Sequence, residues 1–295
     1  MQHNSRVRLA LVASAIGALV ISTSGVAGAS TSITGKYNAA AAKLVPAAYK
    51  SKVLQVASDA TYAPDESMSG SNVVGFDVDL IKAVATTLGV KVKETNVTFD
   101  SIILGIQSGK YQIGNSSFTD TKAREKQVNF VDYFQAGEGL YAKASFTGTV
   151  TGLKSLCGLR VAVETSTVEQ TDAQNTAKTC PSNKKLTVKP YPTQTEADLA
   201  VSTGQADVGF LDSQIAGYVV AKSKGVFKLV GSAINVAPYG IATAKNPNGL
   251  ALAKAIQAAI KVLIANGTYS AVLKKWGVSA GAIPASRVVL NGAIS

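Results

Sequence analysis

Residues 116–126, SSFTDTKAREK, gather four hydroxyl side chains just ahead of a single arginine, Arg124. The preceding run YQIGN predicts a strand that would bring Ser117 and Thr119 to the carboxyl edge of a sheet, where open α/β sheets hold ligands. Oxygen atoms exposed there can accept hydrogen bonds from an ammonium group. The guanidinium of Arg124 presents a planar fork that matches a carboxylate. This combination suits an α-amino acid.

The same residues also fit a purely structural role. Thr119 or Thr121 could cap a short helix, and Arg124 could then pair with Asp120 or Glu125 at the surface. Taken alone, the segment favours this structural interpretation.

Few other side chains could do chemistry. The only histidine, His3, lies in a segment that we expect to be cleaved, which excludes triads that need a histidine base. The two cysteines, Cys157 and Cys180, would pair as a disulfide in an oxidising compartment. Two cysteines without a histidine do not complete a closed zinc shell, so we expect no metal ion and no cofactor.

The N-terminus has the order of a secretory signal peptide. Arg6 and Arg8 precede an apolar run and then small residues up to Ala29. We therefore expect a signal peptide over 1–29 and a leader rich in small residues over 30–50. Because no cysteine lies near the cleavage site, we expect an exported protein without a lipid anchor, in the periplasm or the extracellular or cell-wall space.

The charge balance does not indicate a nucleic-acid partner. The 295-residue chain carries 29 basic and 18 acidic side chains, for a net charge of +11. Its lysines are scattered and are not interleaved with aromatic residues, which is typical of a solvated basic surface. We expect a monomer that binds no nucleic acid.

Short strands alternate with helices along the rest of the chain, for example a strand over 53–59 followed by a helix over 75–89. This succession indicates an α/β fold with mainly parallel sheets flanked by helices. The alternation of strands and helices starts again in the middle of the chain, so we expect two lobes. The first lobe would comprise 51–141 and 236–295, and the second 142–235. A cleft between two such lobes is a usual place for a small ligand.

Seven motifs occur in a characteristic order along the expected mature chain: ASDATYAP, GFDVDLIKAVA, FDSIILGIQSGKYQIGNSSFTDTKAREKQVNFVDYF, VAVETSTVEQ, STGQADVGFLDSQIAGYVV, PYGIATAKN and NGTYSAVLKKWGV. In sequence and spacing they resemble the family-3 solute-binding proteins of bacterial amino-acid ABC transporters. The resemblance implies a two-lobed periplasmic-binding-protein fold of type II. It also implies a receptor that closes on an amino acid and docks on a membrane permease.

The resemblance assigns a carboxylate clamp. In the family, the arginine matching Arg124 binds the α-carboxylate of the ligand, and backbone amides at positions matching Thr167 and Val168 complete the clamp. Such amides are available because these residues begin a predicted helix, whose first N–H groups have no partner within the helix. Ser166 stands where the family has a glycine.

The resemblance also assigns an ammonium site. Oxygen atoms at positions matching Ser117 and Thr119 meet the α-ammonium group, together with an acid matching Asp212. Asp212 ends a predicted strand, so it could also cap the helix that follows.

Two aromatic residues and two acids would surround the ligand side chain. Tyr62 and Phe99 match positions that sandwich it in the family, although both could simply pack in the core. Asp59 and Glu164 would lie near its far end, which favours a cationic or strongly polar amino acid, because an unpaired buried carboxylate is costly. Glu164 could instead face solvent, and the positive net charge favours an acidic ligand. Asp65 replaces a usual phenylalanine at the pocket edge.

Two other functions share this scaffold. A dehydratase or lyase would need Glu164 or Asp59 as a general acid or base. A ligand-sensing module would present its closed form to a membrane receptor. The complete set of amino-acid contacts favours binding over catalysis, and we expect no enzymatic activity.

Overall fold

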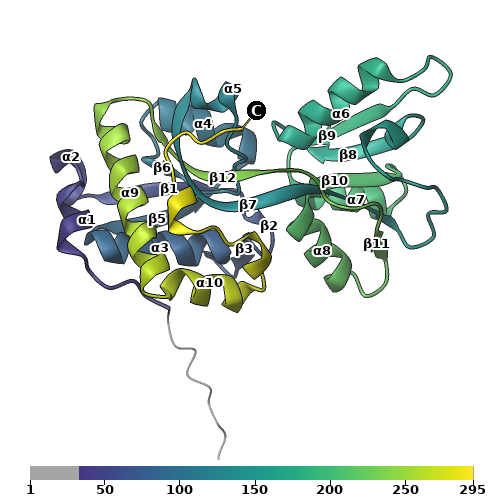
Figure 1. Cartoon of the computed structure of the whole chain (residues 1–295). Helices are drawn as coiled ribbons and strands as arrows, with labels where there is room; N and C mark the ends of the chain where they lie inside the picture. The colour runs from purple at the N-terminus through teal and green to yellow at the C-terminus, as the bar shows by residue number, and fades with distance from the viewer. Residues whose placement is uncertain (1–32, 295) are drawn as a thin grey trace, which may run out of the picture. The chain divides into compact units, whose positions relative to one another are not determined.

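The computed structural model describes residues 33–294, and the expected signal peptide lies outside these residues. The chain from Ile33 onward forms one compact unit, shown in Figure 1. Its elements form two lobes joined by two long strands, β7 (Val128–Lys143) and β12 (Ile234–Ala244). The two-lobed α/β fold is thus the one that the sequence predicts.

The first lobe contains elements from both ends of the described chain. Its N-terminal elements are α1 (Ala39–Lys43), α2 (Ala47–Lys50), β1 (Val53–Ser58), β2 (Thr61–Tyr62), β3 (Glu66–Ser69), β4 (Asn72–Val74), α3 (Phe76–Leu88), β5 (Lys91–Asn96), α4 (Phe99–Gln107), β6 (Ile113–Gly114) and α5 (Lys122–Glu125). Its C-terminal elements are α9 (Pro247–Ala265), α10 (Thr268–Trp276) and two 3-10 turns, Ser279–Gly281 and Ala285–Arg287.

The second lobe is built from the middle of the chain. Its elements are a 3-10 turn (Leu153–Leu156), β8 (Arg160–Glu164), α6 (Val168–Thr179), β9 (Thr187–Tyr191), α7 (Gln194–Ser202), β10 (Val208–Asp212), α8 (Ser213–Lys222) and β11 (Phe227–Leu229).

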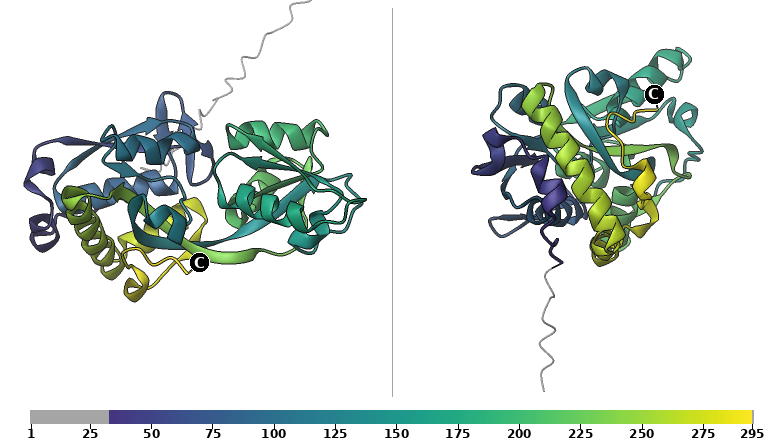
Figure 2. Two further views of the ribbon diagram at one scale, coloured as in Figure 1. Left: turned by 90° about the horizontal axis from the view of Figure 1, so that it is seen from above. Right: turned by 60° about the vertical axis from the view of Figure 1, so that its left-hand side comes forward.

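The sheet differs from the two separate parallel sheets that the sequence indicates. One mixed sheet runs through both lobes in the order β5-β1-β6-β12-β7-β10-β8-β9, with β11 also on β7. The outer strands are parallel, β1 with β5 and β6, and β8 with β9 and β10. The crossing strands β7 and β12 are antiparallel to their neighbours. Seen from above, these two strands connect the lobes (Figure 2).

Helix α3 follows the sequence prediction closely. Its apolar stripe, including Phe76, Leu80 and Ile81, is fully buried, and Gly89 ends the helix in the left-handed conformation with φ 68°. A left-handed C-terminal residue favours glycine, because a Cβ is strained there. Asp77 and Asp79 lie in the first turn of this helix.

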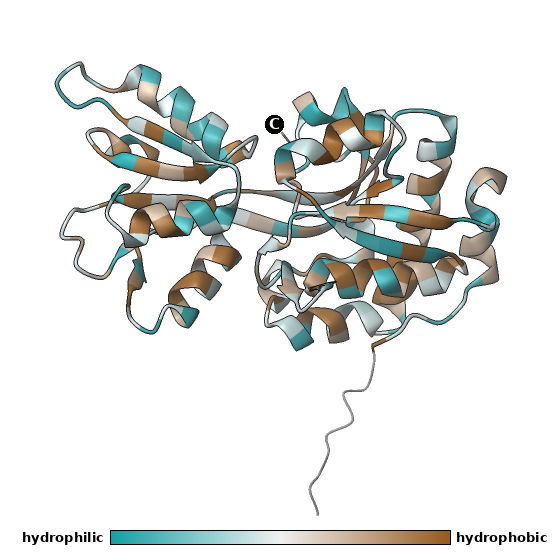
Figure 3. Ribbon diagram, turned by 180° about the vertical axis from the view of Figure 1, so that it is seen from behind, coloured by the Kyte–Doolittle hydropathy of each residue, from teal (hydrophilic) through white to brown (hydrophobic). Residues whose placement is uncertain are grey.

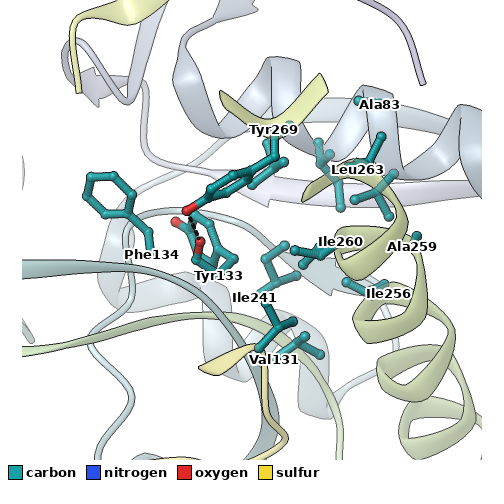
Figure 4. Close-up of a cluster of buried hydrophobic side chains, with 14 of the residues drawn as sticks. Ala83, Val131, Tyr133, Phe134, Ile241, Ile256, Ala259, Ile260, Leu263 and Tyr269 are labelled. Atoms are coloured by element: carbon teal, nitrogen blue, oxygen red, sulfur yellow. Dashed lines mark hydrogen bonds between the residues drawn. The ribbon is translucent and has the colours of Figure 1, made fainter. Parts of the chain in front are cut away.

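The core of the first lobe lies between the sheet and helices α3, α9 and α10. One face of α9 is completely buried and consists of Leu252, Ile256, Ile260 and Leu263. In the same cluster the Tyr269 hydroxyl donates to the carbonyl oxygen of Tyr133 at 2.8 Å (Figure 4). By length and composition α9 alone among the described helices could cross a membrane, but its apolar face packs into this core.

The second lobe has its own hydrophobic clusters and the disulfide. Leu156, Val161, Val163 and Phe210 belong to one of these clusters. Hydrophobic and hydrophilic residues alternate around its helices, as the colouring of Figure 3 shows. The disulfide that the sequence predicts joins Cys157, after a 3-10 turn, to Cys180 at the end of α6, with the Cα atoms 5.5 Å apart.

The fold begins earlier than the sequence indicates. Residues 33–50 fall in the expected leader, but they form helices α1 and α2 rather than a plain connection. The Asn38 side chain caps α1 by accepting a hydrogen bond from the Ala41 amide at 3.0 Å. Ala41 and Val45 then pack into the core of the first lobe. The sequence does not indicate these two helices, because small residues give little hydrophobic periodicity.

Candidate functional site

All ten residues that the sequence selects as ligand contacts line one pocket between the lobes. The first lobe supplies Asp59, Tyr62, Phe99, Ser116, Ser117, Thr119 and Arg124, and the second lobe supplies Glu164, Thr167, Val168, Glu169 and Asp212. Ser116 and Glu169 are additions to the predicted set. The structure thus brings together elements far apart in the chain, while the contacts of each residue with a ligand stay predictions.

Arg124 points from α5 toward the second lobe. Its Nη1 donates to the Thr119 carbonyl oxygen and its Nη2 to the Ser166 carbonyl oxygen, both at 2.8 Å. The side chain is 9 % exposed and lies 5.4 Å from the ring centres of Phe99 and Phe118. Burial lowers the pKa of Arg124, and the charges of nearby acids oppose that shift. A buried guanidinium over two aromatic rings is a fixed anion-binding fork.

The structural interpretation of the arginine segment is right in part. Thr121 caps α5, since its Oγ1 accepts a hydrogen bond from the Arg124 amide at 3.2 Å. Arg124, however, forms no ion pair with Asp120 or Glu125 among the described residues, and Glu125 pairs with Lys122 instead. The cap therefore orients the helix, and the guanidinium remains directed at the pocket.

The start of α6 faces Arg124 from the second lobe. Thr167 caps this helix by accepting a hydrogen bond from the Gln170 amide at 3.1 Å, and its own hydroxyl donates to the Glu164 carbonyl oxygen. Val168 is therefore the first helical residue, where N–H groups have no partner inside the helix. Ser166 has φ 68°, a left-handed conformation that explains why a glycine suits this position.

Asp212 lies at the end of β10 and bonds across the lobes to Tyr62. The Tyr62 hydroxyl donates to Asp212 Oδ2 at 2.8 Å and accepts a hydrogen bond from the Asp212 amide at 3.0 Å. Asp212 occupies the N-cap position of α8, as the structural alternative has it, but its side chain accepts no hydrogen bond from the amides of that helix. Burial raises the pKa of Asp212 to about 6, while hydrogen bonds from Tyr62 and Tyr239 and the charge of Arg124 oppose the shift.

Asp59 is held by three donors of its own lobe. Its carboxylate accepts hydrogen bonds from the Thr61 amide at 2.9 Å, the Thr61 hydroxyl at 2.6 Å and the Phe99 amide at 3.0 Å. The last bond fixes the first residue of α4, so Phe99 presents its ring beside Phe118, with ring centres 4.5 Å apart. Phe99 therefore both packs in the core and lines the pocket.

Glu164 faces the pocket and not the solvent. It ends β8, is 2 % exposed and lies against Asp59 of the other lobe. Burial, and then the charge of Asp59, raise the pKa of Glu164 well above its ordinary value. Both causes favour the neutral form of this carboxyl group, whereas a cation placed beside it would favour the charged form.

Glu169 is the functional candidate that the sequence reasoning missed. It is the second residue of α6, is 2 % exposed, and one of its carboxyl oxygens has no protein partner. Burial and the charges of Asp212 and Glu138 raise its pKa, while Arg124 opposes the shift. Its position one residue after Val168, in the first turn of the predicted helix, was the signal available.

The lobes meet directly, so the pocket is nearly filled by protein. Arg124 bonds to Ser166, Tyr62 to Asp212, and the Gln194 amide to the Thr61 hydroxyl at 3.2 Å, each across the lobes. The remaining cavity of about 10 Å³ holds about one water molecule. A wider groove of about 870 Å³ opens beside it and shares Arg124 and Asp212.

Comparison with known proteins gives one family for most of the chain. Residues 54–279 match the model of the bacterial extracellular solute-binding proteins, family 3. The arginine-binding protein ArgT of Corynebacterium glutamicum is 30% identical over 243 residues, which cover 81% of this chain and 79% of that protein. The ABC transporter glutamine-binding protein GlnH of Bacillus subtilis is 31% identical over 213 residues, which cover 70% and 74%.

Solved structures show the same fold. An ancestral arginine-binding protein bound to arginine superposes with a TM-score of 0.71 at 31% sequence identity, over 77% of this chain and 99% of that chain. Its likeness extends over both lobes and the crossing strands, because so much of each chain is covered.

Proposed function

Because the chain belongs to the bacterial extracellular solute-binding proteins of family 3, we propose that it binds a free amino acid between its lobes and delivers it to an ABC-transporter permease. The observation that carries this proposal is the meeting of Arg124 with the start of α6 and with Asp212 in one buried pocket. Arg124 and the helix amides suit the α-carboxylate. Asp212, Ser117 and Thr119 suit the α-ammonium group.

We propose a cationic amino acid as the ligand, with L-arginine as the first candidate. Four acids and one arginine line the pocket: Asp59, Glu164, Glu169, Asp212 and Arg124. A carboxylate on Arg124 and an ammonium at Asp212 leave Glu164 and Asp59 free to meet a second positive charge. Relatives named for arginine support this class, although one relative named for glutamine shares a similar identity.

The direct contacts between the lobes define what ligand entry requires. The cavity is far smaller than an amino acid, so the lobes must separate before binding. The crossing strands β7 and β12 are the connections through which this hinge motion passes. A ligand that touches both lobes then favours the closed state, because it gains contacts only there.

The partners follow from the family. A closed receptor would dock on a membrane permease, with ATP hydrolysis supplied by a separate subunit. We place the protein outside the cytoplasmic membrane, on the strength of the N-terminal sequence and the family's extracellular members.

Thermal unfolding tests the proposed function directly. The chain from Ser30 would be melted alone and with each of the twenty amino acids, and again as Arg124→Ala. A ligand that binds only the folded state at a hundredfold excess over Kd adds about 2.7 kcal/mol to the free energy of unfolding. We expect the largest shift with L-arginine and its loss in Arg124→Ala.

The pattern of shifts separates the alternatives. A shift with glutamate or aspartate would keep the receptor and overturn the cationic ligand. No shift with any amino acid would overturn amino-acid binding and favour an enzyme in which Glu164 or Asp59 is the general acid. A matched control is Arg160→Ala, because Arg160 pairs with Asp207 at the surface of the second lobe, away from the pocket lining.

A further inference from the structure

Three carboxyl groups lie buried directly behind Ser117, outside the pocket lining. Asp65 follows β2, Glu66 begins β3, and Asp77 lies in the first turn of α3. Each is 0 % exposed. We call these three residues the acid cluster. Buried carboxylates are usually compensated by a cation, and this group is therefore unusual.

No basic side chain compensates the acid cluster in residues 33–294. The ion pairs there do not include Asp65, Glu66 or Asp77. The side-chain donors that reach the cluster are neutral, namely the hydroxyls of Ser117 and Tyr133 and the amide of Gln214. No group of acids in this part of the chain is arranged to hold a metal ion.

The nearest charged groups add to the negative potential. Asp59 faces Glu66, and Asp212 faces Asp65 from the second lobe. Tyr133 from β7 also contacts the cluster, and Tyr239 from β12 faces Asp65. Burial first and mutual repulsion second raise the pKa values of Asp65 and Glu66. Both causes favour a proton shared within the cluster while no cation is near.

Ser117 connects the acid cluster to the pocket. Its hydroxyl donates to Asp65 Oδ2 and its amide donates to Asp77 Oδ2, both at 2.9 Å. These two bonds hold Ser117 at φ 47°, a left-handed conformation that a serine rarely adopts. Because the single hydroxyl proton is committed to Asp65, only the lone pairs of Oγ remain for the pocket. Ser117 can then accept a hydrogen bond there but cannot donate one.

We propose that Asp65 is a specificity-determining residue, because it makes the Ser117 subsite select a protonated amine. When the amine binds, the acid cluster releases a shared proton to solvent. The proposal rests on the proposed amino-acid ligand. The amine keeps its own proton, and the departing proton is replaced by the positive charge of the ligand. A neutral donor in the same place would not drive the release.

Asp65 also links this subsite to closure of the lobes. Gln214 of α8 donates to Asp65 Oδ2 at 3.2 Å and to the Tyr239 hydroxyl at 2.6 Å. Asp65 Oδ2 thus receives one bond from each lobe, through Ser117 and through Gln214. Closure brings a neutral amide and the acid Asp212 to the cluster, and no basic side chain, so the positive charge there would come from the ammonium group of the ligand.

Isothermal titration of two proteins with two ligands tests the proposal. The proteins are the natural chain and Asp65→Asn, which keeps an acceptor for Ser117 but removes the charge and the proton. The ligands are L-arginine and 5-guanidinopentanoic acid, which lacks the α-amine but keeps the carboxylate and the guanidinium. Titration in buffers of different ionisation enthalpy counts the protons released.

We expect Asp65→Asn to weaken L-arginine binding about tenfold or more, since a charge-assisted interaction is lost. The number of protons released should fall by up to about one per ligand. Binding of 5-guanidinopentanoic acid should be the same in both proteins. The affinity of the natural chain for L-arginine should also rise with pH, because the liganded cluster is the less protonated state.

Equal proton release in the two proteins would overturn the proposal while leaving amino-acid binding intact. So would an equal loss of affinity for both ligands, because it would show a merely structural role. No binding of L-arginine to the natural chain would overturn both this proposal and the cationic ligand. Asp79→Asn is the matched control, an acid two residues along α3 that pairs with Lys275 at the surface.

A second variant covers the case in which Asp65→Asn does not fold. Glu66→Gln removes a charge from the same cluster without touching the strongest Ser117 bond, since its nearest carboxyl oxygen is 3.5 Å from the Ser117 hydroxyl. We expect it to reduce proton release on L-arginine binding. Unchanged release would overturn the role of the cluster.

Discussion

At the scale of the residue, the pocket contains more acidic side chains than basic ones, and they surround one fixed arginine. In the closed arrangement Arg124 donates hydrogen bonds to two backbone carbonyl oxygens, one in each lobe. Glu164 and Asp59 lie against each other across the boundary between the lobes, and no charged donor lies between them in the described residues. Closure without a ligand therefore brings like groups together, and a cationic ligand relieves that cost.

Glu164→Gln tests this balance with two opposite effects. The free energy of unfolding should rise by about 1 kcal/mol, because a buried acid beside Asp59 becomes a neutral amide. Affinity for L-arginine should fall at least about tenfold, because a charged partner is lost. Chemical unfolding and isothermal titration measure the two effects. Glu196→Gln, at the exposed start of α7, is the control, and a fall in both quantities would contradict the prediction.

The sequence could select the ten pocket residues mainly because they lie in motifs that resemble the family, which implies their positions. It could not reveal the burial of Asp65, Glu66 and Asp77, since acidic residues in a turn and a first helical turn usually face water. Glu169 was missed for the same reason. A polar residue becomes buried through contacts between distant segments, and local patterns carry no record of them.

At the scale of the element, β7 decides the architecture. This 16-residue strand is buried almost throughout and pairs with β12 in the first lobe and with β10 and β11 in the second. The sequence indicates its first half, VNFVDYF, as a strand. The continuation QAGEG contains two glycines and reads as a connection, but pairing with β10 and β12 overrides that weak local preference.

The disulfide secures one corner of the second lobe. It joins residues 23 positions apart, and a loop of about that length is worth about 3 kcal/mol to the free energy of unfolding. Cys157→Ser with Cys180→Ser should therefore lower the melting temperature. We expect ligand affinity to change little, because neither cysteine lines the pocket.

A reductant provides the check on that expectation. Calorimetry of the natural chain with a thiol reductant should show the same lowered melting temperature as the double variant. The double variant itself should not respond to the reductant. An unchanged melting temperature in the double variant would show that the disulfide does not contribute to stability.

At the scale of the whole molecule, buried acids make stability depend on pH. Burial is the main cause that raises the pKa values of Asp132 and Glu138 to about 8, Glu94 to about 7 and Asp120 to about 6. These acids bind more protons in the folded state than in the unfolded state between their ordinary and raised values. Stability therefore falls as pH rises through that interval.

Melting curves recorded between about pH 5 and about pH 9 should show a fall of about 4 °C or more toward the alkaline end. Asp132→Asn should flatten the dependence, because it removes one acid of the buried Asp120–Asp132 pair. Asp100→Asn, at the exposed start of α4, should leave it unchanged. A melting temperature that rises steadily with pH would contradict this account.

The return of the chain through β12 has a consequence for the timing of folding. Strand β6 of the first lobe pairs with β12, which is synthesised much later. The buried face of α9 likewise completes a core to which the earlier helix α3 contributes. The second lobe, by contrast, is encoded in one continuous stretch. During synthesis the first lobe thus remains an open, unfinished chain until the ribosome has nearly released the product. For a chain that is exported, this order delays the complete core of the first lobe until β12 and α9 have been made.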